Sequence, residues 1–194
     1  MNNLCEHSFF SDGSVVWNIE STDKFEAIRE VVYRSQVFRR IPQLDIEDFA
    51  AKVIEREKVQ STGFGHGVAV AHGRTADVSV PLVALGVSNN GLEFGSMDGR
   101  PVQLLFVVAN HPDSEMDYLK VLSCLVGLVR NELFRHELLS CASRTELENK
   151  LCSSFMSLLA KNYRQETEGN EQCSPEDACR SGFETHQTLE RRLG

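Results

Sequence analysis

The chain has 194 residues, of which 41% are hydrophobic and 25% are charged, and these are ordinary values for a soluble globular protein. Its formal net charge of −8 at pH 7 argues against nucleic acid as a main partner and favours a basic protein partner. No apolar run approaches the length of a membrane span, and no basic segment followed by an apolar one opens the chain. We therefore expect a cytoplasmic protein without membrane insertion.

No internal repeat and no linker rich in Pro, Gly or Ser divides the chain, so we expect one domain with two tails. Residues 1–13 mix small and polar side chains without periodicity and predict a loose lead-in. Residues 163–194 lose periodicity and most apolar side chains, which predicts a flexible or partly helical tail. The domain then spans residues 14–162. The six cysteines form no CxxC pair, and disulfides are not expected in the helices.

The first predicted elements are one strand and two helices. Residues 14–20 alternate apolar and polar side chains and predict a short strand. A helix then starts at one of the capping residues 21–23, keeps apolar residues at helical spacing, and ends before Pro42. Asp45 opens a second helix, which carries Arg56 and Glu57 at its end.

Later in the chain, two continuous apolar runs at 80–87 and 102–109 predict strands that are covered on both faces. The segments 89–91 and 97–100 have the chemistry of turns. Three helices follow, at residues 113–129, 131–139 and 144–162, and the stripe from Leu119 to Val129 is expected to be core. This order of elements predicts an α/β fold, a three-layer α/β/α sandwich with a mixed central sheet.

The stretch from Ser61 to Thr75 has the composition of a site. Its alternate positions hold glycines, Gly63, Gly65 and Gly67. These lead into the apolar run Val68–Ala71, which presents His72 and then Gly73. Alternating glycines permit positive φ and let backbone N–H groups converge on an anion, so a phosphoryl group is the expected guest.

The two common phosphate loops do not match this stretch. No lysine followed by Ser or Thr stands at the spacing of a Walker loop. The glycines also lead into a β-branched run and not into a helix, which disfavours a dinucleotide fingerprint. A pair of metal ligands from His66 and His72 lacks a cysteine or carboxylate at convincing spacing. We therefore expect no metal and no cofactor.

A family resemblance is carried by Arg56-Glu57 followed by Ser61-Thr62-Gly63-Phe64-Gly65-His66-Gly67-Val68-Ala69-Val70-Ala71-His72-Gly73-Arg74. This resembles the signature of the type-2 EIIA domains of the phosphotransferase system (PTS), of the fructose, mannitol and nitrogen-regulatory type. That signature reads Arg-Glu, then Ser/Thr-Thr-Gly-Ile-Gly-x-Gly-Ile-Ala-Ile-Pro-His-Gly. The resemblance covers about residues 17–159 and implies the mannitol/fructose-like EIIA fold.

The resemblance also implies roles for individual residues. Its last histidine carries the phosphoryl group, which makes His72 the phosphoacceptor, and the arginine at Arg56 faces it. A neutral imidazole is a competent nucleophile near pH 7 because its reference pKa is about 6.5. We expect the phosphoryl group to be cradled by hydroxyls and loop N–H groups of five residues: Ser61, Thr62, Gly65, His66 and Gly73.

Two positions depart from the family pattern. The family places a second histidine in a His-Leu-x-x-Leu motif, and here that position is Tyr118. A tyrosine can donate one hydrogen bond to a phosphoryl oxygen, but not as a cation. Ala71 stands where the family has proline, which restores a backbone N–H before His72.

These observations favour three functions. The first is a phosphorelay regulator of the nitrogen-regulatory class, which takes phosphate from a histidine phosphocarrier protein of the HPr kind and is read by regulatory target proteins. The second is a sugar-transport EIIA that passes phosphate to an EIIB. The third is a binding module that kept the fold and lost turnover, which the change at Tyr118 makes credible. The chain would be a phosphotransferase only in the first two cases.

Overall fold

The computed structural model describes residues 9–10 and 12–171. The chain falls into two compact units, residues 1–156 and residues 157–194. The first unit contains the sheet and helices α1 to α5, together with the first part of helix α6 (Arg144–Glu171). In the described residues, the second unit is the rest of α6. The helix runs past the predicted domain end at 162, and residues 172–194 of the predicted tail lie outside the described residues.

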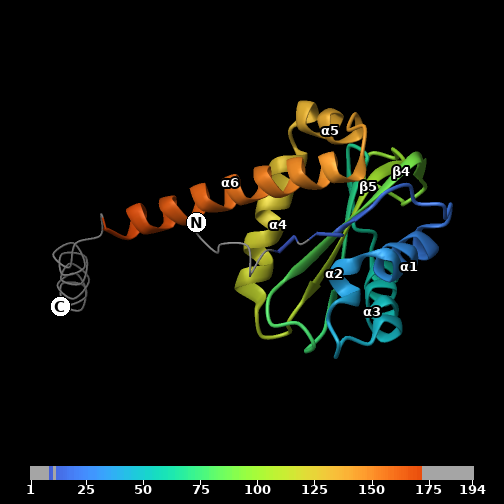
Figure 1. Ribbon diagram of the computed structural model, residues 1–194, viewed down its shortest axis with the longest axis horizontal. Helices are drawn as coiled ribbons and strands as arrows, with labels where there is room; N and C mark the ends of the chain where they lie inside the picture. Colours follow the sequence, from blue (N-terminus) through green and yellow to red (C-terminus); the bar gives the residue numbers. More distant parts are fainter. Residues whose placement is uncertain (1–8, 11, 172–194) are drawn as a thin grey trace, which may run out of the picture. The chain divides into compact units, whose positions relative to one another are not determined.

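A five-stranded mixed sheet lies at the centre of the first unit (Figure 1). Its order is β1-β4-β5-β3-β2, and the strands are β1 (Val15–Val16), β2 (Gly63–Gly65), β3 (Val68–Arg74), β4 (Leu82–Leu92) and β5 (Val102–Asn110). The pairs β1/β4 and β3/β5 are parallel, whereas β4/β5 and β2/β3 are antiparallel. The two apolar runs predicted as strands form β4 and β5, which lie side by side and are buried on both faces.

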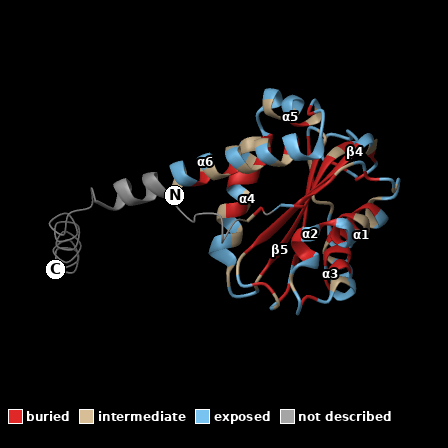
Figure 2. Cartoon of the chain, viewed as in Figure 1, coloured by how far each residue is buried: buried red, intermediate tan, exposed pale blue. Residues whose placement is uncertain are grey.

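Three helices cover one face of the sheet: α1 (Lys24–Arg34), α2 (Gln36–Arg39) and α3 (Ile46–Val59). Asp23 and Asp45 cap α1 and α3 with side-chain hydrogen bonds to backbone N–H groups, as the sequence predicted. The buried side chains of these helices pack on the odd-numbered residues of β3 and β5, Ala69, Ala71, Leu105, Val107 and Ala109. Figure 2 shows the sheet and the inner faces of these helices as buried.

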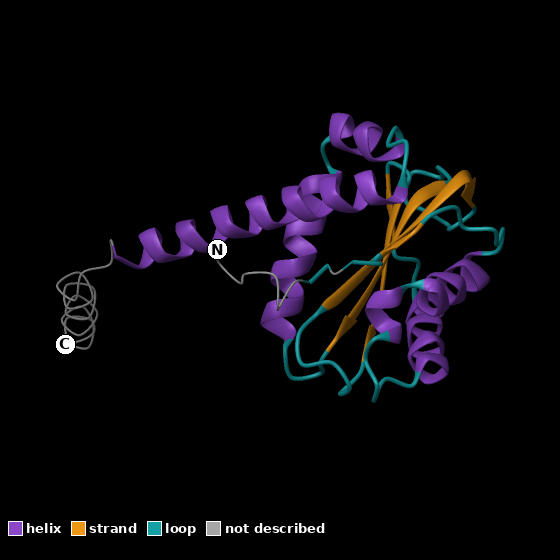
Figure 3. Ribbon diagram, in the orientation of Figure 1, coloured by secondary structure: helices purple, strands orange, loops and turns teal. Residues whose placement is uncertain are grey.

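The opposite face carries α4 (Glu115–Val129), α5 (Glu132–Leu139) and the part of α6 that belongs to the first unit (Figure 3). Val121 and Leu125 of α4 and Phe155 of α6 are fully buried there. Helices on both faces of a mixed sheet make the predicted three-layer α/β/α sandwich, which is confirmed. The stripe on α4 is less buried than predicted, because Leu119 is 48% exposed.

Three local expectations were wrong, each for a backbone reason. The first strand is only two residues long, because Asn18 adopts a positive φ of 57°. The helix expected before Pro42 breaks at Ser35, whose ψ of 126° is extended, so it forms α1 and α2. The turn expected at 89–91 lies inside β4, where a register shift against β5 absorbs the positive φ of Gly91.

The described part of the predicted lead-in is tied to the core. The backbone carbonyl of Phe9 accepts a hydrogen bond from the N–H of Val83 at 2.9 Å. The rings of Phe9 and Phe10 pack edge-on against Phe155, with centroids 5.9 and 5.0 Å apart. Residues 1–8 and 11 lie outside the described residues.

Gly73 allows α3 to approach the end of β3 closely. A Cβ atom added there would lie 2.8 Å from Cγ2 of Val53 and 3.1 Å from Cε2 of Phe49, inside van der Waals contact. Since both neighbours belong to the packed core of α3, they have little room to move. Gly73 therefore holds a packing position, although the sequence assigned it to phosphoryl binding.

We expect Gly73→Ala to destabilise the fold by about 1 to 3 kcal/mol, because the added methyl group overpacks the contact between α3 and β3. Ser123→Ala on the exposed surface of α4 is the control and should change the free energy of unfolding by less than about 0.5 kcal/mol. Urea denaturation of both variants measures the difference. Equal stability of the two variants would show that α3 does not press on Gly73.

Candidate functional site

His72 lies two residues before the end of β3, on the face of the sheet that carries α4. Side chains alternate along a strand, so Gly73 faces α3 and His72 faces the opposite side. The His72 ring contacts the ring of Tyr118 on α4, with centroids 5.3 Å apart and planes tilted by 41°. Its Nδ1 lies 3.4 Å from the carbonyl oxygen of Val70. A proton on Nδ1 would point to this carbonyl and leave the lone pair on Nε2.

The electrostatics of this pair of rings favour a neutral imidazole. Burial lowers the pKa of His72 below its usual value, and the charges of Arg56 and Arg74 lower it further. The Val70 carbonyl and Glu57 act in the opposite direction. Burial also raises the pKa of Tyr118, against the effect of the same two arginines, so its hydroxyl keeps its proton at neutral pH. A neutral imidazole and a neutral phenol thus lie in the field of two cations.

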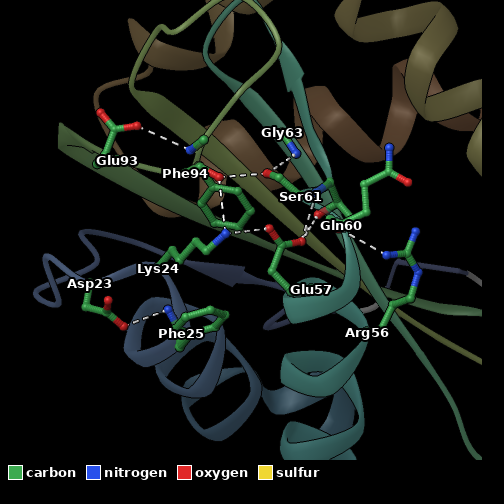
Figure 4. Close-up of polar contacts among 12 residues, drawn as sticks. Asp23, Lys24, Phe25, Arg56, Glu57, Gln60, Ser61, Gly63, Glu93 and Phe94 are labelled. Carbon is green, nitrogen blue, oxygen red and sulfur yellow. Dashed lines mark hydrogen bonds and ion pairs between the residues drawn. The ribbon is translucent and has the colours of Figure 1, made fainter.

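The two arginines reach this point from different elements. Arg56 is on the last turn of α3, and its Nη1 donates to the carbonyl of Gln60 at 3.1 Å (Figure 4). Arg74 ends β3, and its Nη2 lies 3.7 Å from a carboxylate oxygen of Glu115 on α4. Both members of that ion pair are more than 60% exposed, so it holds Arg74 weakly. Arg74 is therefore available to an anion that approaches His72.

The buried carboxylate of Glu57 organises the chain between α3 and β2. Its Oε2 accepts hydrogen bonds from the backbone N–H of Thr62 at 2.9 Å and from the Thr62 hydroxyl at 2.6 Å. Its Oε1 lies 3.1 Å from the ammonium group of Lys24 on α1. The Glu57 side chain has no exposed surface, so its charge needs these partners. This arrangement, drawn in Figure 4, fixes the turn that leads into β2.

Ser61 reinforces the same turn. Its hydroxyl donates to the carbonyl of Phe94 at 2.7 Å and accepts from the N–H of Gly63 at 3.2 Å. Lys24 also donates to the Phe94 carbonyl, at 3.4 Å. Both hydroxyl protons, of Ser61 and of Thr62, are thus bound to protein acceptors. We assign these two residues to the support of the site, whereas the sequence placed them on the phosphoryl group.

Gly65 and His66 do not lie near His72 in this structure. His72 pairs with Val108 on β5, whereas Val68 at the beginning of β3 pairs with Leu104, so His72 is about 13 Å from the beginning of the strand at 3.3 Å per residue. His66 precedes that beginning, and its N–H donates to Asp98 at 2.7 Å. The predicted cradle therefore separates into a part beside His72 and a part at the other end of β3.

Two residues of the site were not assigned a role from the sequence. Arg74 is two residues after His72, so the alternation of a strand would have placed both on one face. Glu57 was visible only as half of the Arg-Glu pair, and its burial depends on Lys24, 33 residues earlier. Strand alternation is a local signal, but a partner from another helix is not.

The described residues also limit other kinds of site. No group of three or more His, Cys, Asp or Glu side chains among them is placed to hold a metal ion. Within the same residues, no helix is both long and apolar enough to cross a membrane.

Residues 8–153 match the family model described as phosphoenolpyruvate-dependent sugar phosphotransferase system, EIIA 2. The match covers most of the chain and includes every element of the site, so the chain belongs to this family.

Two relatives illustrate its range. The chain is 35% identical to the fructose-specific EIIABC component of the PTS of Bacillus subtilis (strain 168) over 127 residues. These residues make up 65% of this chain. That stretch spans only 20% of the relative's length. The chain is 27% identical over 135 residues to a nitrogen regulatory protein of Pseudomonas aeruginosa, covering 70% of this chain and 86% of the relative.

Solved structures have the same fold. Nitrogen regulatory protein IIA-Ntr from Neisseria meningitidis superposes with a TM-score of 0.67 and 29% identity, covering 74% of this chain and 96% of that chain. The complex of enzyme IIAMTL and phosphorylated enzyme IIBMTL from Escherichia coli gives a TM-score of 0.61 at 20% identity, covering 74% of this chain and 97% of that chain. The EIIA fold predicted from the sequence is confirmed.

We expect Glu57→Ala to lower the free energy of unfolding by about 2 to 4 kcal/mol, because it removes the partner of a half-buried ammonium group and of the Thr62 N–H. Glu55→Ala is the matched control on the same helix. Glu55 pairs with Lys58 at 2.7 Å on the surface, so its loss should cost less than about 1 kcal/mol. Guanidinium denaturation measures both, and similar losses would contradict the anchoring role of Glu57.

The His72 imidazole should titrate below the usual value of about 6.5, because burial and two arginines disfavour its protonated form. NMR of the imidazole resonances measures the midpoint. Arg56→Gln should raise it by removing one positive charge, whereas Arg39→Gln on α2 should leave it unchanged. The unfolded state binds this proton more readily than the folded state does. The free energy of unfolding should therefore fall as the pH drops below about 6.5. A midpoint above the usual value would contradict this electrostatic account.

Proposed function

We propose that His72 accepts a phosphoryl group from a histidine phosphocarrier protein of the HPr kind, and that the chain acts in the cytoplasm as a phosphorelay regulator of the nitrogen-regulatory type. The observation that carries this proposal is a half-buried imidazole with a lowered pKa, placed against Tyr118 and within the field of Arg56 and Arg74. This is the arrangement that a nucleophile for an anionic group requires.

Transfer exchanges one phosphorus–nitrogen bond for another. The lone pair on Nε2 of His72 attacks the phosphorus, while the bond from phosphorus to the donor imidazole breaks in line with it. The electron pair of the broken bond stays on the donor nitrogen. Because the transferred group keeps its negative oxygens throughout, positioning and charge neutralisation supply most of the catalysis.

The residues around His72 divide this task. Arg56 and Arg74 neutralise the equatorial oxygens, and the protonated hydroxyl of Tyr118 donates one hydrogen bond to them. Each hydrogen bond to a charged group contributes about 1.5 to 3 kcal/mol. Tyr118 adds no positive charge where the family has a second histidine, so transfer depends on the two arginines.

Exposed apolar side chains on the same two helices offer a docking surface for the phosphocarrier. Val59 follows Arg56 on α3 and is 83% exposed, and Leu119 follows Tyr118 on α4 and is 48% exposed. Met116, one turn earlier on α4, is 68% exposed. A partner that buries these side chains would bring its own phosphohistidine to His72 and exclude water from the transfer.

The comparisons are compatible with both the nitrogen-regulatory and the sugar-transport assignment. A nitrogen regulatory protein of Pseudomonas aeruginosa matches 70% of this chain at 27% identity, and fructose components match 65% and 51% of it at 35% and 34% identity. We take the nitrogen-regulatory function as the first candidate. Onward transfer to an EIIB is the second candidate, and the complex of IIAMTL with phosphorylated IIBMTL supports it by fold. If the chain acts as a nitrogen-regulatory protein, its target proteins distinguish the phosphorylated from the unphosphorylated state by binding them with different affinity.

The test is intact-protein mass after incubation with phosphoenolpyruvate, enzyme I and a histidine phosphocarrier. We expect a gain of about 80 Da, the mass of one phosphoryl group, which is lost in acid and absent from His72→Ala. Arg56→Ala should slow the gain by roughly tenfold or more, since one charge-assisted hydrogen bond is lost. Arg39→Ala, away from the site, is the control and should react at the wild-type rate.

The outcomes separate the candidate functions. Phosphate that passes from His72 to an EIIB cysteine would favour the sugar-transport function. Phosphorylation at another residue, or an equal rate for Arg56→Ala and Arg39→Ala, would contradict the proposed site. Absence of any gain with the cognate carrier would leave the binding module as the function.

A further inference from the structure

A cavity lies at the beginning of β3, away from His72. It has a volume of about 370 Å³, within the range of small-molecule sites. Its walls come from the turn before β3, the end of β4, the start of β5 and helix α5. Because β3 and β5 run parallel and in register, this cavity and His72 lie toward opposite ends of these two strands.

The polar lining of the cavity is mainly basic or neutral. It includes six side chains that can donate hydrogen bonds, His66, Asn90, Arg100, Gln103, Arg135 and His136. Glu132 is the one acidic residue in the lining, which is drawn from the described part of the chain. With both histidines neutral, Arg100, Arg135 and Glu132 give the lining one net positive charge, although the whole chain carries a net charge of −8. Guanidinium groups in a concave site attract anions.

Hydrogen bonds hold the walls in place. Asp98 accepts from the N–H groups of His66 at 2.7 Å and Arg100 at 3.1 Å, which joins two sides of the cavity. These hydrogen bonds also lower the pKa of the Asp98 carboxyl. The carbonyl of Gly67 accepts from the N–H groups of Gln103 at 2.8 Å and Leu104 at 3.0 Å. The backbone of the cavity is therefore organised before any ligand enters.

The position of Arg135 is also fixed. Its Nη1 donates to the carbonyl oxygens of Val129 at 2.6 Å and of Arg130 at 3.1 Å, at the junction of α4 and α5. This leaves the other edge of the guanidinium group for a ligand. His66 has a φ of 56°, a left-handed conformation that is costly for a residue with a side chain and recurs at ligand sites.

Several lining side chains have hydrogen-bonding capacity to spare. Within the residues that the structure describes, the side chains of Asn90, Gln103 and His136 form no hydrogen bond with another protein group. The Arg100 guanidinium is 71% exposed and lies 3.9 Å from Asp98, which is a weak pairing. A fixed cavity with unpaired donors can bind an anion without first breaking internal bonds.

We propose that this cavity binds a small organic phosphate. The guanidinium groups of Arg100 and Arg135 match a phosphate group, and the amides of Asn90 and Gln103 match hydroxyl groups on the carbon part of the ligand. Pro101, Leu104 and Leu139 supply an apolar surface for that carbon part. Glu132 accepts a hydrogen bond from a ligand hydroxyl. The site is separate from His72 and does not depend on phosphoryl transfer.

Isothermal titration calorimetry of the full chain tests the proposal with adenosine monophosphate, ribose 5-phosphate, inorganic phosphate and uncharged ribose. We expect saturable binding of one of the two organic phosphates with a Kd of about 1 mM or lower. Ribose should not bind, and inorganic phosphate should bind more weakly than the organic phosphate. NMR titration should show shifts of the His66 and His136 imidazole resonances and leave that of His72 unchanged.

Variants locate the binding. Arg100→Gln and His136→Gln change exposed side chains, so both should fold, and Arg100→Gln should weaken binding by about tenfold or more. Arg39→Gln removes the same charge from α2 and should bind like the wild type. His72→Ala should also bind like the wild type, which separates this site from the proposed phosphoacceptor.

Other results would overturn the proposal. Failure of both organic phosphates to bind at about 1 mM would remove it. Equal weakening by Arg100→Gln and Arg39→Gln would show attraction by overall charge and no specific site. Loss of binding in His72→Ala would move the phosphate to the transfer site.

Discussion

The buried carboxylate of Glu57 is the interaction on which the site depends. It joins Lys24 of α1, the end of α3 and the N–H and hydroxyl of Thr62, so one charge connects the start of α1 with the end of α3 and the turn that follows it. A carboxylate with no exposed surface is stable only while all of these partners are present. Arg56 precedes Glu57 on the same helical turn. The hydrogen bonds and the ion pair that hold Glu57 therefore also fix the backbone position of Arg56.

Successive side chains of β3 point to opposite faces of the sheet, and the two faces have different roles. Gly73 faces α3 and permits the close approach that brings the end of this helix to the strand. His72 faces α4 and meets Tyr118, where burial lowers the pKa of the imidazole and raises that of the phenol. One strand therefore places a neutral imidazole, the proposed nucleophile, between a packed core and two arginines. The proposed chemistry depends on charges supplied by α3 and β3.

The two ends of β3 have separate chemistry. The glycine-rich turn before the strand, with its positive φ values, builds a wall of the basic cavity, while the end of the strand presents His72. A stretch that looked like one phosphate loop in the sequence is thus two features joined by a strand. If both bind phosphate groups, the binding site and the site of transfer are linked by a strand that pairs with β5 along its whole length.

The sequence alone determined the three-layer fold, the central strands and the position of His72, because apolar runs, caps and a local signature depend on neighbouring residues. It also indicated Arg56, through its place in that signature. Only the tertiary structure decided that Gly65 and His66 lie away from His72, that Ser61 and Thr62 bond to protein acceptors, and that Gly73 serves packing. These outcomes depend on Phe94, Asp98 and Val53, which reach the loop from other elements. Spacing along a chain cannot reveal such partners, since they become neighbours only when the sheet and helices pack together.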